Sequence, residues 1–141
     1  MDPIVALAVA GALLVGTLVV GFVWQARDGR RRSGHGRRVD AEDTGALAPR
    51  ATLVQFSTEL CARCPQVRRM LGQVADAHDG VVHTEVDLTH RTDLASKYHV
   101  LQTPTTFLVD AAGVVRARFN GVPRRADVEE ALGAFPRLQE A

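Results

Sequence analysis

The segment Ser57-Thr58-Glu59-Leu60-Cys61-Ala62-Arg63-Cys64-Pro65 guides the interpretation of the whole chain, because it contains both cysteines of the protein. It follows an apolar run, Leu53-Val54-Gln55-Phe56, which predicts a buried strand. After it, apolar residues recur at the spacing of one helix face. These residues are Val67, Met70, Leu71, Val74 and Ala75. The sequence therefore places Cys61 where a strand ends and a helix begins.

The start of a helix favours the reactive form of a cysteine. Unpaired backbone N–H groups and the positive end of the helix dipole stabilise an anion there, and a thiolate is an anion. Such a position lowers a thiol pKa from about 8.5 toward neutrality. Cys64, one helical turn further on, is spaced to form a disulfide with Cys61 after a first exchange. We therefore expect Cys61 to attack, Cys64 to resolve, and the charge of Arg63 to tune the thiol pKa.

The chain resembles the thioredoxin family in this segment and in a second one. The resemblance rests on the strand, the Cys61-Ala62-Arg63-Cys64 motif, the amphipathic helix, and Gln102-Thr103-Pro104-Thr105 before an apolar strand. It covers roughly residues 50 to 135. It implies an α/β, thioredoxin-like fold with a four-stranded mixed sheet flanked by helices. It also implies that Pro104 is cis and that Thr103 and Pro104 offer a backbone edge to an extended client.

Four departures from the usual family pattern surround the cysteines. Leu60 stands where thioredoxins usually have tryptophan, and Ala62-Arg63 replaces glycine-proline. Gln55 takes the place of a buried aspartate that assists proton transfer, and Glu85 stands where many members have lysine. The expected fold is unaffected, whereas ordinary thioredoxin reactivity does not follow. The alternative function is a non-catalytic, membrane-tethered module in which the cysteines hold a partner or sense its redox state.

Residues 51–141 are expected to form the thioredoxin-like domain, in the order βαβαββα. The apolar share of the chain, 46%, is ample for one core. Strands are expected near 52–57, 81–87 and 105–110, and a further strand has Val115, Ala117 and Phe119 on one face. The helices are expected from the cysteines to about His78, near 93–98, and around Val128, Ala131, Leu132 and Phe135.

An uncharged segment precedes this domain. Residues 4–24 contain no charged side chain and are long enough to cross a hydrocarbon layer of about 30 Å. A cleaved signal peptide is the rival interpretation, but Met1-Asp2-Pro3 lacks a basic residue and Trp24-Gln25-Ala26 is a poor cleavage site. We therefore expect residues 1–26 to be a transmembrane anchor and the protein to contact the membrane through residues 4–24.

Residues 27–50 are rich in arginine, glycine, aspartate and alanine and show no apolar period, which predicts a basic flexible linker. The positive-inside rule places the arginine-rich side of a span in the cytoplasm. We therefore expect a single-pass membrane protein whose soluble domain is cytoplasmic. Topology accounts for these charges, so no nucleic-acid partner is expected. The arginines that follow the span are Arg27, Arg30, Arg31, Arg32, Arg37 and Arg38, and no basic residue precedes it.

A zinc site competes for the same cysteines. The spacing C-x2-C-x13-H-x4-H matches a Cys2His2 site formed by Cys61, Cys64, His78 and His83. A zinc finger needs both histidines on one helix, yet Asp79-Gly80 ends the predicted helix between them. Redox chemistry is therefore the favoured interpretation, and zinc remains an alternative.

The expected activity is thiol–disulfide exchange with protein clients. Cys61 attacks a client disulfide, and Cys64 then attacks Cys61 to release the reduced client. In a reducing cytoplasm the net direction is reduction. The partners are protein thiols or disulfides and an electron donor that the sequence does not identify. No metal, nucleotide or flavin cofactor is expected, and the oligomeric state is left open.

Overall fold

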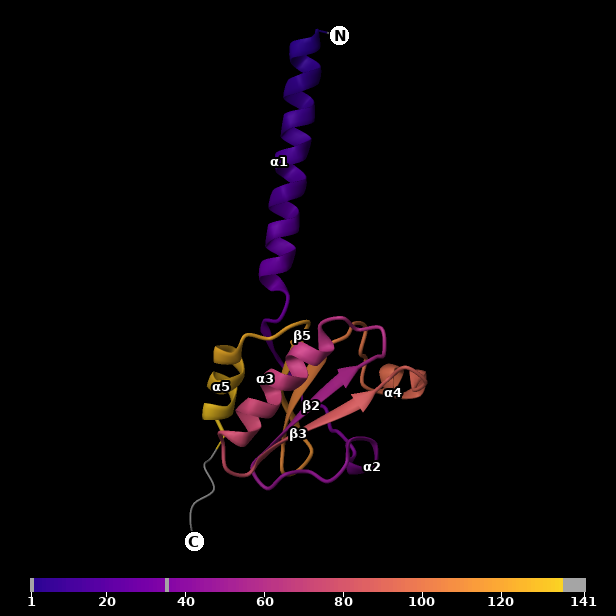
Figure 1. Ribbon diagram of the computed structural model, residues 1–141, viewed down its shortest axis with the longest axis vertical. Helices are drawn as coiled ribbons and strands as arrows, with labels where there is room; N and C mark the ends of the chain where they lie inside the picture. The colour runs from indigo at the N-terminus through magenta and orange to yellow at the C-terminus, as the bar shows by residue number, and fades with distance from the viewer. Residues whose placement is uncertain (1, 35, 136–141) are drawn as a thin grey trace.

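The chain forms a long N-terminal helix and an α/β domain at its end (Figure 1). The structure is a computed structural model that describes residues 2–34 and 36–135. The strands are β1 (Arg31–Ser33), β2 (Ala51–Ser57), β3 (Val81–Asp87), β4 (Thr105–Asp110) and β5 (Val115–Asn120). The helices are α1 (Pro3–Arg27), α2 (Ala41–Thr44), α3 (Cys64–Asp76), α4 (Thr92–Lys97) and α5 (Arg125–Gly133).

The strands form one mixed sheet in the order β1-β5-β4-β2-β3. β2 runs parallel to β3 and antiparallel to β4, and every residue of β2 is buried. A continuous apolar run is typical of a strand that is covered on both faces. The strands predicted around 52–57, 81–87 and 105–110, and the alternating strand from Val115, are confirmed. The expected α/β fold, with a mixed sheet flanked by helices, is confirmed as well.

Each face of the sheet has its own core. Leu53 packs with Val67 and Leu71 of α3 and with Val128 of α5 on one face. On the other face, Phe56 and Phe107 meet edge to face with ring centroids 4.9 Å apart. Successive side chains of a strand point to opposite faces, so β2 contributes to both cores. The burial of these cores fixes β2, and with it the position of the cysteine segment.

The region 27–50 differs from the expected flexible linker. β1 pairs antiparallel with β5, with Arg31 opposite Phe119, so the sheet has a fifth strand that the sequence did not predict. The buried Val39 donates its N–H to Gly113 O at 2.8 Å, and the Lys97 ammonium bridges Asp40 and Asp43 at 2.6 Å. An exposed edge strand is held by backbone hydrogen bonds and needs no apolar period. The folded unit therefore begins well before residue 51.

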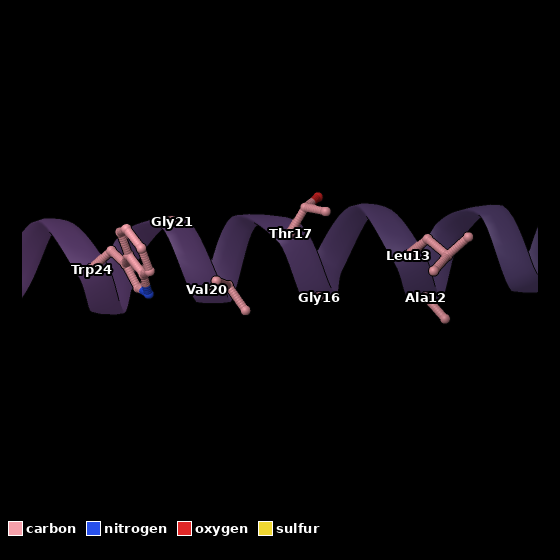
Figure 2. A pocket seen from close by; sticks show the side chains of 7 residues that line it. All are labelled: Ala12, Leu13, Gly16, Thr17, Val20, Gly21 and Trp24. Atoms are coloured by element: carbon pink, nitrogen blue, oxygen red, sulfur yellow. The ribbon is translucent and has the colours of Figure 1, made fainter.

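Helix α1 is long and apolar enough to cross a membrane. None of its residues is buried against the rest of the protein. Figure 2 shows one side of it, where Gly16 and Gly21 leave a shallow groove beside Val20 and Trp24. Thr17 donates its hydroxyl to Leu14 O at 2.8 Å, so this polar group is satisfied within the helix. Between Ile4 and Trp24 the helix thus presents no charged side chain to its surroundings.

Candidate active site

The two cysteines lie where β2 ends and α3 begins, as the sequence predicted. After β2 the backbone turns twice: Cys61 N–H donates to Thr58 O at 3.1 Å, and Cys64 N–H donates to Cys61 O at 3.3 Å. Cys64 is the first residue of α3, and Pro65 follows it. Proline is favoured in the first turn because its fixed φ suits a helix and it has no N–H to leave unpaired. The local sequence thereby places the sulfurs at the positive end of a 13-residue helix.

Cys61 and Cys64 form a disulfide, with Cα atoms 5.4 Å apart. Cys64 is only 2% exposed, because it faces the core under α3, whereas Cys61 is partly exposed. The disulfide is therefore exposed mainly through Cys61. The order of attack expected from the sequence stays a prediction.

A second loop lies against the cysteine segment. The Thr103–Pro104 peptide bond is cis, which is the form that the resemblance implied. Thr103 Oγ1 lies 3.3 Å from Thr58 Oγ1, so one hydroxyl hydrogen bond joins the two loops. Pro104 is buried, and its carbonyl accepts a hydrogen bond from Gly121 N–H at 2.8 Å. The structure thus brings Thr103 and Pro104 to the same end of the sheet as the disulfide.

Beneath the disulfide, a buried amide connects α3 to β3. Gln55 has no exposed surface. Its Nε2 donates to Cys64 O at 3.0 Å, and its Oε1 lies 3.0 Å from His83 Nε2. An amide oxygen can only accept, so in this arrangement His83 Nε2 carries the hydrogen. Burial lowers the pKa of His83 below its ordinary value, which favours the neutral ring.

The sequence pattern pointed to His83 only as a zinc ligand and missed this connection. The parallel register places Leu53 opposite His83 and Gln55 opposite Glu85. Residues of equal parity on paired strands share a face, and diagonal neighbours on that face are within reach of long side chains. The contact between Gln55 and His83 could therefore be predicted only with knowledge of the register of β2 on β3.

The carboxylate of Glu85 forms an ion pair with a residue of α3. Arg68 forms a two-pronged ion pair with it, with Nη2 2.7 Å from Oε1, and Ser57 donates its hydroxyl to Oε1 at 2.5 Å. The hydrogen bond from Arg68 lowers the pKa of Glu85, so the carboxylate form is favoured. Arg68, whose side chain is exposed on α3, therefore fastens α3 to β3.

Arg63 precedes the first residue of α3, and its side chain is exposed. Glu59 is the acidic residue nearest to it in the sequence. Glu59 is exposed too, and its backbone N–H donates to Thr89 Oγ1 at 3.0 Å. Within residues 2–34 and 36–135, no ion pair joins Arg63 to Glu59. The guanidinium charge thus stays on the turn that carries the sulfurs.

The residues of the zinc alternative serve other contacts. His78 Nδ1 lies 2.8 Å from Val74 O, and His83 is bonded to Gln55. In the described part of the chain, no three or more cysteine, histidine, aspartate or glutamate side chains gather where they could hold a metal ion. The geometry gives the zinc alternative no support.

These features define a class of protein: an α/β domain in which a cysteine pair opens a helix beside a cis-proline loop. The thioredoxin family profile matches residues 42–134, which is well over half of the chain. The chain therefore belongs to the thioredoxin family. The family and the adjacent cysteines support thiol–disulfide redox function in general.

Solved structures agree with this fold. A mutant thioredoxin from Halobacterium salinarum NRC-1 is 22% identical, with a TM-score of 0.54 over 62% of this chain and 76% of its own. Fasciola hepatica thioredoxin is 23% identical, with a TM-score of 0.52 over 61% of this chain and 81% of its own. The Schistosoma mansoni thioredoxin pre-protein is 20% identical, with a TM-score of 0.53 over 65% and 83%. No curated protein gives a significant match.

Proposed function

We propose that this protein is a membrane-anchored thiol–disulfide oxidoreductase that reduces protein disulfides at the cytoplasmic face. The observation that carries the proposal is the unequal exposure of two bonded sulfurs at a helix start, with Cys64 enclosed and Cys61 open to a client. A nucleophile that a client can reach and a resolving thiol that it cannot reach are what two-step exchange requires.

In the reducing direction the cycle starts from the dithiol. The Cys61 thiolate attacks one sulfur of a client disulfide, a Cys61–client bond forms, and the other client sulfur leaves and takes up a proton. Cys64 then loses its proton and attacks Cys61 Sγ. The Cys61–Cys64 disulfide forms, and the second client thiol is released. The client gains two electrons and two protons, and the protein is left in the disulfide form that the structure contains.

Client binding is assigned to the surface around the disulfide. Thr103 and Pro104 lie beside the cysteine loop and supply the backbone edge. Leu60 and Leu101 are 96% and 93% exposed, next to Cys61 in one loop and before Thr103 in the other. Apolar side chains that gather into one exposed patch mark interaction sites, and the loops that carry these two leucines are joined by the hydrogen bond between Thr58 and Thr103. Together they favour an extended, partly apolar client segment.

The membrane location and its side rest on α1 and on the arginines. The helix is of spanning length, and six arginines lie within residues 27–38, after its uncharged segment, while none precedes that segment. By the positive-inside rule, this distribution supports a cytoplasmic domain. A reducing compartment in turn supports net reduction of clients, with an electron donor restoring the dithiol.

Trapping of mixed disulfides tests the proposal. Cys64→Ser keeps the attacking sulfur but removes the resolving one, so covalent client complexes should accumulate on Cys61. Cys61→Ser is the matched control and should accumulate none. Complexes at equal levels in both variants, or in neither, would remove the basis for the assigned order of attack.

A further inference from the structure

We propose that residues 28–33, here called the strap, hold the disulfide end of the domain against the membrane, so that the clients are membrane proteins whose disulfides lie at headgroup level. This inference rests on the proposed function. It adds the class of client and the reason why soluble proteins are disfavoured.

The strap leaves no free chain between the helix and the domain. α1 ends at Arg27, and Asp28 N–H still donates to Trp24 O at 3.1 Å. The next residue is already on the domain, since Gly29 N–H donates to Asn120 O at 2.5 Å. Pairing of β1 with β5 follows from Arg31 onward. The domain is therefore fastened within two residues of the helix end.

Two glycines allow this close approach. A Cβ on Gly29 would lie 2.0 Å from Val122 O, and the residue has a φ of +75°, so no other residue fits there without strain. A Cβ on Gly121, also at positive φ, would lie 2.4 Å from the carboxylate of Asp28. The strap thus packs directly on the backbone of residues 120–122.

The strap also contacts the loop that lies beside the disulfide. Gln102 Nε2 donates to Asp28 Oδ1 at 3.2 Å, and Gln102 directly precedes Thr103 and Pro104. Thr103 in turn meets Thr58 of the cysteine loop. In Figure 1, the arrowhead of β2 and the start of α3 lie at the end of the domain from which α1 extends. The helix end, the cis-proline loop and the disulfide therefore share one end of the domain.

The strap therefore keeps the disulfide close to the bilayer surface. A domain of about 100 residues has a radius of gyration of about 13 Å, hence a diameter of roughly 34 Å, so a site on its far end would stand that far from the bilayer. A free linker over residues 27–50 would add an end-to-end distance of about 27 Å. The strap removes both distances. The exposed Leu60 and Leu101 then face a client segment as it emerges from the membrane, at the level where tryptophan and tyrosine side chains are enriched.

The test compares near and far disulfides on the same membrane. The full chain is reconstituted in phosphatidylcholine–phosphatidylglycerol vesicles with single-span peptides that carry a cysteine disulfide either at the interface or beyond a rigid helical spacer of about 40 Å. We expect the near disulfide to be reduced at least about tenfold faster, since only it shares the volume that the site samples. A variant with a flexible insertion of about 20 Gly/Ser residues between Arg27 and Asp28 keeps the contacts of the strap with the domain and should reduce both peptides at rates within about threefold of each other.

A soluble protein disulfide, offered to the same vesicles, separates the two claims. The parent should reduce it more slowly than the insertion variant does, because the insertion lets the disulfide end of the domain move away from the membrane. If the parent reduces near and far peptides at equal rates while it stays active on the soluble disulfide, the inference is overturned and the proposed function stands. If it reduces none of the three substrates, the proposed function itself fails.

Discussion

Replacing Gln55 and His83, singly and together, measures the buried hydrogen bond between them. Gln55→Leu removes both bonds of the amide, to Cys64 O and to His83 Nε2. His83→Leu removes only the shared bond. Because both variants lose the same bond, the double variant should lose less stability than the sum of the single losses.

The magnitudes follow from burial and partners. A neutral hydrogen bond contributes about 1 kcal/mol net, and a buried group left unpaired costs about 1–3 kcal/mol. Gln55→Leu loses two bonds, but Cys64 O keeps its bond within α3 and a buried leucine recovers part of the loss. We expect a cost of about 1–2 kcal/mol. His83→Leu leaves the fully buried Oε1 of Gln55 without a partner, at a cost of about 1–3 kcal/mol, and the coupling should be about 1 kcal/mol.

Urea unfolding of the oxidised domain, residues 28–141, at about pH 7.5, where His83 is neutral, gives the four free energies. The control cycle pairs Gln55→Leu with Val115→Ala, which lies in the core on the other face of the sheet, and should be additive within about 0.5 kcal/mol. If the Gln55–His83 cycle is additive to the same degree, the bond contributes nothing and the geometry assigned to the site is wrong.

Three further variants test charge around the cysteines. Burial lowers the pKa of His83, so the unfolded chain binds a proton on this residue first, and stability falls as pH drops below about 6.5. His83→Gln should reduce that loss of stability when unfolding is measured from about pH 7.5 to 5.5. An unchanged dependence of stability on pH would contradict this expectation. The hydrogen bond from Arg68 lowers the pKa of Glu85, so the ion pair contributes to stability above about pH 4.5 and this contribution is lost below it. Glu85→Gln should lower the free energy of unfolding by about 0.5–1 kcal/mol at neutral pH and leave it unchanged in acid. An equal loss of stability at both pH values would refute the ion pair. Arg63→Gly should raise the thiol pKa of Cys61 by less than about one unit, seen in alkylation rate against pH, and superimposable curves would show that the arginine does not tune the nucleophile.

The core of the fold was predictable because its signals are local. The apolar run before Ser57 and the helix-face spacing after Cys64 required burial on two sides, and both elements formed where expected. The alternating strand that follows the turn at Gly113, where φ is +83°, was equally readable. Burial of apolar surface drives these elements, and the sequence displays it directly.

The parts that were missed depend on pairing between distant segments. β1 is a strand of exposed polar residues that is held by backbone bonds to β5, so no periodicity marks it. The links from Gln55 to His83 and from Arg68 to Glu85 need the register of β2 on β3 and the docking of α3. Sequence spacing places the cysteines on one helix turn, but the contacts beneath them arise only when three elements meet.

The most direct test of the central claim is turnover by the two cysteines. The full chain is added to a protein disulfide and a small dithiol reductant, and the rate of disulfide reduction is recorded. We expect the parent to accelerate the reaction with each molecule acting many times, and Cys61→Ser and Cys64→Ser to reduce that acceleration to the uncatalysed level. A parent that binds the client without accelerating its reduction, or cysteine variants as active as the parent, would contradict the account and favour a module that holds or senses its partner.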